Sequence, residues 1–374
     1  MRRQALSQAH GSVLLFDVNA GVGDLSQFSS LVVDWQKLHG RHNLPWQNTR
    51  DPYPVWLSEV MLQQTQVSTV LDYFNRFVKR FPTVATLAEA PLDDVLGLWS
   101  GLGYYSRARN MHSCAQQIMS EHGGKFPRTA ELLQSLPGIG PSTAAAIASF
   151  CYCEKVAILD GNVKRVLTRV LAFEKDLSDR ANERALWVLA NKLLPQTNLM
   201  EVMPSYTQGM MDLGATVCTR RNPKCRVCPV QTVCKSLHDG HPEKYPVKTK
   251  KVKRSSSKLW LLWAQIEDGW IWLTKRPDSG IWGGLYCLPV FDSKEALLRF
   301  VPHADEIKTR TLPDVKHVLT HKDLLLSPIV VCVPKTEKRS LESLDASGKW
   351  VSRGDYAALG LPAPIRKLLQ QEWT

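Results

Sequence analysis

The 374-residue chain lacks any uninterrupted run of about 18 apolar residues, which is the length that a membrane-spanning helix requires. The apolar run near its start covers only residues 13–16, too short for the hydrophobic core of a secretory signal. No internal repeat is visible. Most of the nine cysteines are scattered through apolar stretches as small core residues, so a disulfide-rich secreted protein is not indicated; these are Cys114, Cys151, Cys153, Cys287 and Cys332.

Acidic residues are also in short supply, since 35 Asp and Glu face 47 Lys and Arg and the net charge is +12. Lys and Arg exceed Asp and Glu by 25 to 19 over residues 1–237, by 7 to 2 over 238–258 and by 15 to 14 over 259–374. The positive excess therefore lies on the first two segments, which favours a polyanionic partner. A basic protein whose lysines are merely solvated is the alternative on charge alone.

Composition and periodicity divide the chain into two domains around a basic linker. Hydrophobic residues make up 44% and charged residues 22%, as in an ordinary soluble globular protein. Residues 238–258, HDGHPEKYPVKTKKVKRSSSK, have no apolar periodicity and are predicted to be the linker. Helical spacing of apolar residues precedes it, in segments 53–80, 92–99, 104–121, 129–136, 142–150, 163–173, 180–194 and 204–214. After it, 259–266 and 270–276 flank an Asp-Gly turn as a β-hairpin, 327–334 is a strand, and 293–301 and 363–372 are helices.

Four further cysteines gather in one segment, CTRRNPKCRVCPVQTVC (218–234): Cys218, Cys225, Cys228 and Cys234. Four thiolates that close together are typical of a metal or iron–sulfur site. A zinc site usually pairs two C-x2-4-C knuckles, and only one C-x2-C pair is present here. The spacing therefore favours an iron–sulfur cluster over zinc, with a disulfide knot as a third alternative. The basic residues of this segment suggest a phosphate-rich partner.

The stretch LPGIGPSTAAAIASF (136–150) predicts a short helix, a tight turn through Gly138 and Gly140, and a second helix. Backbone N–H groups at the start of that second helix can approach a phosphate closely because glycine has no side chain. Such a hairpin binds the duplex backbone without reading its sequence. An ordinary connection between two helices is the alternative.

Two carboxylates are candidates for acid–base chemistry. Asp160, in AILDGNVKRVL, follows an apolar run and begins a helix, so it is either a simple N-cap or a functional carboxylate. Glu59 lies among apolar residues in VWLSEVMLQQTQV, which would raise its pKa unless the side chain is solvated. One protonated and one ionised carboxylate form the pair that breaks a glycosidic bond.

These segments together resemble the MutY adenine DNA glycosylases of the helix-hairpin-helix, endonuclease III-like superfamily. The resemblance also rests on LPW (44–46), GLGYYSRARN (101–110) and MMDLGATVCTRRNPKC (210–225), and covers roughly residues 28–374. It implies an N-terminal extension of residues 1–27, an all-helical glycosylase domain of residues 28–237 with a cluster-binding loop of residues 218–234, and an α+β Nudix-like domain of residues 259–374. It also implies a 4Fe-4S cluster on the four cysteines.

The implied substrate is duplex DNA with adenine opposite 8-oxoguanine or guanine, the adenine being flipped out and its bond to deoxyribose hydrolysed. Glu59 matches the family's general acid, Asp160 the carboxylate that stabilises or captures the sugar, and Asn162 a residue that orients the site. The remaining matches are to residues that contact DNA. Gln64 and Tyr104 match wedge residues, Thr65 and Leu102 match contacts to the oxidised guanine, and Arg41, Trp46, Leu62 and Gln208 match the adenine pocket.

Ser142 stands where endonuclease III-like lyases carry a nucleophilic lysine, and serine cannot form a Schiff base. A monofunctional glycosylase that leaves an abasic site is therefore expected. Lys164 lies nearby in sequence and is predicted to contact phosphate first. Trp46 and Leu62 are equally compatible with plain core packing.

The second domain resembles a Nudix fold through KRPDSGIWGGLYCLP (275–289). The following residues lack the REx2EEx2G arrangement that gathers divalent metal, so binding without hydrolysis is expected. Leu319-Thr320-His321 matches the family's Phe-Ser-His loop that senses 8-oxoguanine. Thr320 keeps the hydroxyl and His321 is retained, whereas Leu319 replaces an aromatic residue.

Two alternatives remain: an endonuclease III-like glycosylase/lyase, and a non-catalytic iron–sulfur DNA-binding protein that would not depend on Glu59 or Asp160. Repair or replication proteins could dock on the linker, although a solvated tether is favoured there. The protein is expected to be a monomer, in the cytoplasm and associated with the nucleoid if bacterial.

Overall fold

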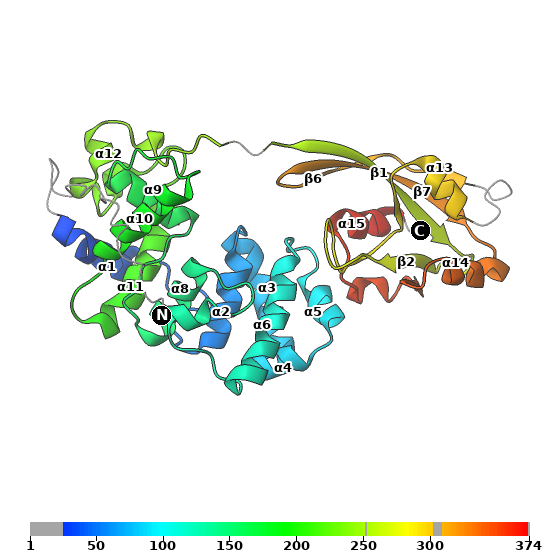
Figure 1. The fold of residues 1–374 in the computed structure, drawn as a ribbon, viewed down its shortest axis with the longest axis horizontal. Coiled ribbons are helices and arrows are strands. Elements are labelled where there is room, and N and C mark those ends of the chain that lie inside the picture. Colours follow the sequence, from blue (N-terminus) through cyan, green and yellow to red (C-terminus); the bar gives the residue numbers. More distant parts are fainter. Residues whose placement is uncertain (1–24, 251–252, 302–308, 373–374) are drawn as a thin grey trace, which may run out of the picture. The chain divides into compact units, whose positions relative to one another are not determined.

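The structure is a computed structural model that describes residues 25–250, 253–301 and 309–372 (Figure 1). By their mutual contacts these residues form two units. The first unit combines the residues up to Arg41 with Lys155–Thr249, and the second combines His42–Glu154 with Lys250–Thr374. Most of the predicted extension 1–27 lies outside the described residues.

Residues 25–250 contain helices and, among the described residues of this range, no strand. The helices of the first unit are α1 (Phe28–His39), α9 (Gly161–Val170), α10 (Arg180–Lys192), α11 (Leu199–Asp212) and α12 (Lys235–His238). Those of the second unit are α2 (Pro52–Leu62), α3 (Val67–Arg80), α4 (Val84–Glu89), α5 (Leu92–Trp99), α6 (Ser106–His122), α7 (Ala130–Leu133) and α8 (Pro141–Tyr152). The predicted all-helical first part is confirmed.

The helix predicted over 53–80 is wrong in one respect, because it divides into α2 and α3. The break is a turn in which the N–H of Thr65 donates to the carbonyl of Leu62, with Gln64 at φ 58°. A left-handed residue cannot continue a right-handed helix. Helices α1 and α4 were not predicted; α4 is a short helix that starts at Thr83, whose hydroxyl forms a capping box with Thr86.

The C-terminal part is a mixed sheet with the strand order β3-β2-β1-β7-β5, to which β4, β6 and β8 attach. Strand β1 (Ser255–Gln265) pairs in parallel with β7 (Lys322–Cys332) along its whole length, and the other strand pairs are antiparallel. The remaining strands are β2 (Ile271–Lys275), β3 (Tyr286–Cys287), β4 (Val290–Phe291), β5 (Thr309–Thr311), β6 (Val315–Val318) and β8 (Gly348–Val351). The predicted hairpin is confirmed as β1–β2, and the predicted strand 327–334 is the second half of β7.

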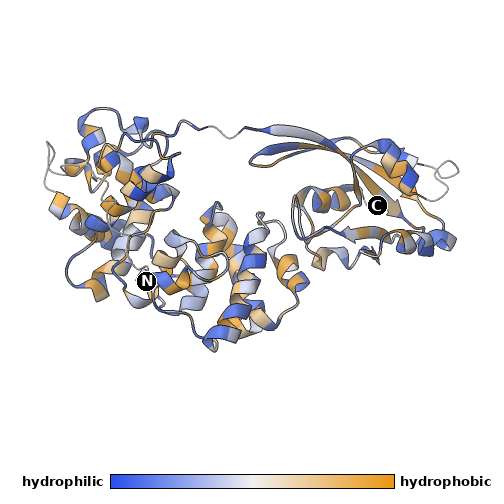
Figure 2. Ribbon diagram, viewed as in Figure 1, coloured by the Kyte–Doolittle hydropathy of each residue, from blue (hydrophilic) through white to orange (hydrophobic). Residues whose placement is uncertain are grey.

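Alternation along β1 divides the core of this sheet into two layers. Leu261 and Trp263 face a cluster that includes α15 (Ala363–Glu372), whereas Leu262 and Ala264 face a cluster that includes α13 (Lys294–Phe300) and α14 (Lys338–Leu344). Successive side chains of a strand point to opposite faces, so an apolar strand of this kind must be covered on both sides. Figure 2 shows hydrophobic residues along these strands and on α15.

The predicted linker, residues 238–258, makes contacts at both of its ends. Its first half packs on the first unit, where the carbonyl of Tyr245 accepts from the Nε–H of Arg169 at 3.2 Å and Thr249 hydrogen-bonds to Asp176. Its last residues belong to the sheet, because β1 starts at Ser255, where a Ser-Ser-Ser-Lys run pairs with β7. None of the helices among the described residues has the length and hydropathy needed to span a membrane.

Candidate functional site

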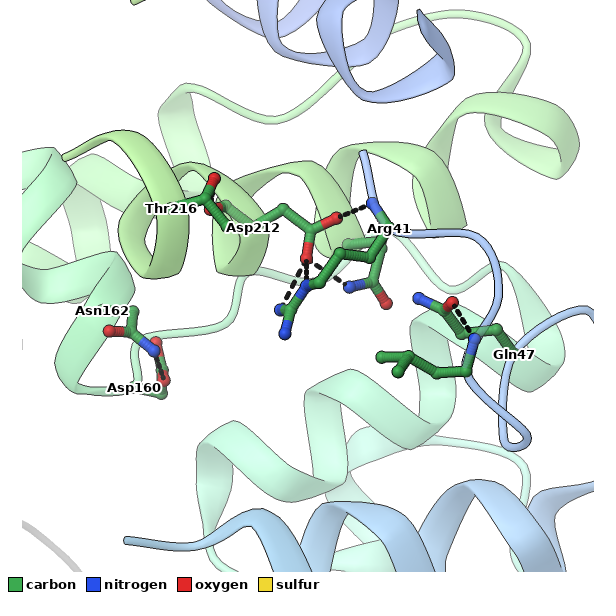
Figure 3. A network of polar contacts seen from close by, with 8 residues as sticks. Arg41, Gln47, Asp160, Asn162, Asp212 and Thr216 are labelled. Atoms are coloured by element: carbon green, nitrogen blue, oxygen red, sulfur yellow. Dashed lines mark hydrogen bonds and ion pairs between the residues drawn. The ribbon is translucent and has the colours of Figure 1, made fainter. Parts of the chain in front are cut away.

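Asp160 is the N-cap of α9, which is one of the two roles predicted for it from the sequence. Its Oδ1 accepts a hydrogen bond of 2.8 Å from the N–H of Val163, and Oδ2 lies 3.4 Å from the side-chain amide of Asn162 (Figure 3). The carboxylate is half-buried and lies where the helix dipole stabilises a negative charge. The cap fixes one oxygen and leaves the other beside Asn162.

Arg165 ties this pair to the cysteine segment. Its guanidinium donates to Oδ1 of Asn162 at 2.8 Å, to the carbonyl of Gly214 at 2.6 Å and to the carbonyl of Cys218 at 2.7 Å. Gly214 lies in a π-helical turn (Leu213–Val217), and a Cβ there would come within 2.6 Å of Cβ of Asn162. The glycine thus permits close packing that holds Asn162 in place.

A second polar network surrounds Asp212 at the end of α11 (Figure 3). Asp212 is 1% exposed and accepts from the backbone N–H of Arg41 at 2.9 Å, from Nε of Arg41 at 2.7 Å and from the side-chain amide of Gln208 at 2.8 Å. A buried carboxylate requires such partners. The structure therefore brings together Arg41 and Gln208, two residues predicted for one pocket, through a residue that was not predicted.

Glu59 lies on the last turns of α2, half-buried and followed by the buried residues Val60 and Met61. It is close enough to Cys151 of α8 to contribute to that thiol's raised pKa of about 12, after burial and Asp51. Ser142 is in the first turn of the same helix α8, directly after Pro141. Both side chains belong to the second unit.

The predicted hairpin is present between α7 and α8. The N–H of Ile139 donates to the carbonyl of Leu136 at 3.2 Å across Pro137 and Gly138, which has φ 76°. That φ favours glycine, and a Cβ there would also come within 2.7 Å of Asn110. Gly140 is the N-cap of α8 and is exposed, with open space where a Cβ would stand. An exposed helix start of this kind is a position where backbone amides can bind a phosphate.

The predicted lesion-contact residues lie in two turns, one after α2 and one after α5. Gln64 and Tyr104 are exposed, Thr65 is half-buried and Leu102 is buried. The hydroxyl of Tyr104 lies 3.0 Å from the hydroxyl of Thr320, which follows β6 in the sheet. Residues that are 216 positions apart thus share one hydrogen bond.

Further contacts join α5 and the residue that follows it to the sheet part of the same unit. Nζ of Lys275 lies 2.6 Å from a carboxylate oxygen of Asp93, and the guanidinium of Arg366 donates to the hydroxyl of Ser100 at 2.8 Å. In the loop after β6, Leu319 packs against the core and His321 is exposed, its carbonyl accepting from Ser255. Leu319 therefore has a packing role, which an aromatic residue at this position would also have.

The other predicted site residues have structural partners. Nζ of Lys164 is 2.5 Å from Glu183 of α10, so an ion pair occupies the amine predicted to contact phosphate. Trp46 is 7% exposed and packs edge-to-face on Phe74 at 5.1 Å between ring centroids. Leu62 is half-buried at the last position of α2.

All four clustered cysteines line one cavity, together with mainly apolar side chains of α9, α12 and the π-helical turn. Nη1 of Arg169, which is 2% exposed, lies 3.3 Å from Sγ of Cys218. Burial raises the pKa of Cys228 to about 12 and raises those of Cys225 and Cys234. Thiols in such a setting lose their protons when they coordinate metal.

The donor set, four cysteines that line one cavity, is chemically suited to an iron–sulfur cluster. Among the described residues, no group of three or more His, Cys, Asp or Glu side chains is gathered closely enough for one metal ion. A four-iron cluster takes cysteine thiolates as its usual protein ligands. Its negative charge also suits the nearby guanidinium of Arg169.

Three residues were missed by the sequence analysis: Asp212, Arg165 and Arg107. Each is a charged side chain that forms hydrogen bonds with neighbouring elements of the fold. The signal available in the sequence was a lone charge inside an otherwise apolar helical stretch, as for Asp212 in GMMDLGA.

Comparisons with known proteins place both parts of the chain. Residues 57–192 match the HhH-GPD superfamily of base excision DNA repair proteins, and residues 260–371 match the NUDIX domain. The chain is 37% identical over 349 residues to an adenine DNA glycosylase of Buchnera aphidicola, covering 91% of this chain and 95% of the relative. It is 41% identical to the human adenine DNA glycosylase over 234 residues, which are 60% of this chain and 42% of that protein. A solved thermostable thymine-DNA glycosylase superposes with a TM-score of 0.50 at 26% identity, covering 57% of this chain and 97% of that one.

Proposed function

The chain belongs to the adenine DNA glycosylases, base excision repair enzymes that act on adenine in DNA, and on that premise we propose that it removes adenine paired with 8-oxoguanine or guanine. The predicted helix-hairpin-helix and Nudix-like fold classes are confirmed. The opposite base, the residue roles, the cofactor and the domain boundaries at 28–237 and 259–374 are our proposals.

The hydrogen bond between Tyr104 and Thr320 carries the proposal on the opposite base. A glycosylase that only removed adenine would need no contact between the loop after α5 and the Nudix-like domain. Two hydroxyls, one from each part, form a polar pair beside the exposed ring of Tyr104. Such a pair can exchange its mutual hydrogen bond for bonds to the edge of an oxidised guanine.

For the chemistry we assign Glu59 as the general acid and Asp160 as the carboxylate that stabilises the sugar cation. Protonation of adenine makes it a better leaving group, and a fixed negative charge stabilises the oxocarbenium-like transition state. The cap that holds one oxygen of Asp160, and the amide of Asn162 beside the other, support this role. Arg41 and Gln208, fixed by Asp212, would bind adenine, with Trp46 and Leu62 as apolar walls.

We propose that the enzyme is monofunctional. Ser142 stands at the start of α8, where a lyase would need a nucleophilic amine, and Lys164, which follows Asp160 on α9, is ion-paired with Glu183. An ammonium held by a carboxylate is a poor nucleophile. The product would be an abasic site with an intact strand.

We also propose a 4Fe-4S cluster on Cys218, Cys225, Cys228 and Cys234, supported by the shared cavity and by Arg169. Bound there, a cluster would cross-link the loop and add no chemistry at the sugar. The loop's Arg and Lys residues would then meet DNA phosphates, as would the amides near Gly138 and Gly140, so affinity should fall steeply with salt. A monomeric state, a cytoplasmic location and protein partners at the linker stay predictions.

The test is single-turnover cleavage of duplexes containing adenine opposite 8-oxoguanine, guanine or thymine, with and without alkali. We expect strand breaks only after alkali, fastest opposite 8-oxoguanine, slower opposite guanine and absent opposite thymine. Glu59→Gln and Asp160→Asn should abolish the breaks, because each removes one charge or proton from the reaction. Glu89→Gln, an exposed residue on α4, is the matched control and should leave the rate unchanged.

Each contrary result contradicts a different part of the proposal. Breaks without alkali would establish lyase chemistry and overturn the reading of Ser142. Equal rates opposite 8-oxoguanine and thymine would overturn the assignment of the opposite base. Binding without base loss in the unaltered protein would favour a non-catalytic DNA-binding role.

A further inference from the structure

Arg107 is a buried cation with an unusual set of partners. It lies at the start of α6 and is 8% exposed, and its guanidinium stands over the rings of Trp99 and Tyr104 at 5.2 and 5.5 Å. No carboxylate forms an ion pair with it among the described residues. Burial accordingly lowers its pKa to about 10. A charge held in this way needs a compensating role.

The guanidinium donates its hydrogen bonds to backbone carbonyls of two separate turns. Nη1 donates to the carbonyls at the end of α2, including that of Gln63 at 2.8 Å. Nη2 donates to the carbonyl of Gly103 at 3.1 Å and to the hydroxyl of Thr65 at 3.2 Å, and lies 3.5 Å from the carbonyl of Leu102. The planar fork thus joins the turn after α2 to the turn after α5.

Both turns contain a residue in a strained backbone conformation. Gln64 has φ 58° and Tyr104 has φ 50°, in the left-handed region that favours glycine or asparagine. Gln64 occupies the third position of a type II turn, closed by the Thr65 to Leu62 hydrogen bond, where side chains other than Gly and Asn are rare. Both side chains are exposed, so packing in the core does not explain the conformation.

Each strained residue directly follows one of the carbonyls that accept a hydrogen bond from Arg107. The carbonyl of Gln63 belongs to the peptide that precedes Gln64, and the carbonyl of Gly103 to the peptide that precedes Tyr104. Fixing the plane of a peptide limits the φ of the next residue. One guanidinium therefore holds two left-handed residues at once.

We propose that Arg107 is a positioning residue that holds Gln64 and Tyr104 in their left-handed conformations and so presents both side chains to the DNA as one preformed unit. This inference rests on the proposed function, in which these two side chains wedge into the base stack next to the lesion. A preformed wedge loses little conformational entropy when it enters DNA. It also holds the Tyr104 hydroxyl against Thr320 before the substrate arrives.

The test compares Arg107→Met, which removes every donor, and Arg107→Lys, which keeps the charge but not the planar fork. Leu87→Ala, in the buried core of α4 against α6, is the control for general destabilisation. Hydrogen exchange is measured on peptides covering 62–66 and 101–105, with α1 as the reference. Single-turnover rates are measured on adenine opposite 8-oxoguanine and opposite guanine.

We expect faster exchange in the two turns of both Arg107 variants, with unchanged exchange in α1. The rate opposite 8-oxoguanine should fall on the order of a hundredfold in Arg107→Met, as expected when contact residues shift by about 1 Å, and the preference over guanine should contract. Arg107→Lys should fall between, since a single ammonium cannot reach both turns. Leu87→Ala should lower the melting temperature yet keep the preference.

The proposal is wrong if exchange in the two turns stays as in the unaltered protein, or if Leu87→Ala, at a matched melting temperature, loses the preference equally. If Arg107→Met does not fold, Arg107→Lys decides by the same measurements. An unaltered protein with no preference for 8-oxoguanine would contradict the proposed function instead. The exchange measurement would then still test the role of Arg107.

Discussion

Replacement of Asp212 by alanine should destabilise the helical part and loosen the adenine pocket together. The side chain is 1% exposed, lies 2.6 Å from Nη2 of Arg41 and accepts from Nε and the backbone N–H of Arg41 and from Gln208. Asp212→Ala leaves all these donors without their acceptor. Removing one partner of a buried ion pair costs about 3–5 kcal/mol, but Arg41 is 32% exposed, so we expect about 2–3 kcal/mol.

For a domain of roughly 200 residues, that loss corresponds to a fall in melting temperature of about 4–12 °C. It is measured by circular dichroism at a wavelength dominated by the helices. Asp212→Asn should cost less, because its amide oxygen still accepts while its NH2 group faces the guanidinium. Adenine excision should slow in both variants, since Arg41 and Gln208 lose their fixed positions.

A double-mutant cycle with Arg41→Ala tests the reasoning. Because the two side chains share one network, the double variant should be more stable than the sum of the single losses predicts, by about 1–2 kcal/mol. Single losses that add within about 0.5 kcal/mol would show that the pair is not coupled. The assigned role of Asp212 as the residue that positions Arg41 would then have to be abandoned.

Three other predictions concern the cavity, the sheet and the linker. Cys218→Ser should lower the iron content of the purified protein and its thermal stability; full iron content in this variant would remove Cys218 from the ligand set. Burial lowers the pKa of His317 below its ordinary 6.5, and the ring of this residue lies 5.9 Å from that of Trp282. The unfolded state therefore binds the proton more readily than the folded state does. We expect the sheet domain to lose stability as pH falls through and below about 6.5. Urea titrations of His317→Gln should show a flatter slope over that range, and an unchanged slope would assign the dependence elsewhere. Asp176→Ala should speed trypsin cleavage of the linker, because Thr249 loses its acceptor; equal cleavage rates would mean that this contact does not hold the linker.

The helices could be predicted because their apolar residues recur at three and four positions, as in segments 92–99 and 363–372. The break between α2 and α3 could not be predicted, since the polar residues 63–66 are compatible with the exposed side of a helix and the break depends on one left-handed residue. That conformation is held by Arg107, which is distant in sequence. Local patterns carry no record of such a contact.

The sheet was predicted least well, for a related reason. The β1–β2 hairpin is local and its Asp-Gly turn is visible in the sequence. The parallel pairing of β1 with β7 joins residues more than sixty positions apart and extends both strands beyond their apolar segments. Ser255 belongs to a strand because β7 pairs with it. The polar run that begins there has no apolar pattern of its own, and it was therefore included in the predicted linker.

The candidate site residues were easier to find than the residues that hold them. Asp160, Gly138 and Ser142 all lie at the starts of helices or in the turn before one, where Gly, Pro and short polar residues mark the boundary in the sequence. Helix starts also carry the positive end of the helix dipole, which favours a negatively charged ligand or side chain. Asp212 and Arg107 lie inside or beneath these elements, and only their partners reveal them.

The contrast between exposed site residues and the buried residues that hold them also applies to the proposed wedge residues. In their proposed role Gln64 and Tyr104 have to be exposed to enter DNA, so they cannot gain conformational order from core packing. Order has to come from the backbone, and a backbone held in a left-handed conformation needs donors from a residue that stays buried. A guanidinium meets that need because its two terminal nitrogens can bind carbonyls of two turns at once, which an ammonium cannot do in the same plane. The proposed wedge needs both the exposed side chains and the buried charge that positions them. A substitution at Arg107 should therefore impair recognition although Gln64 and Tyr104 themselves are not replaced.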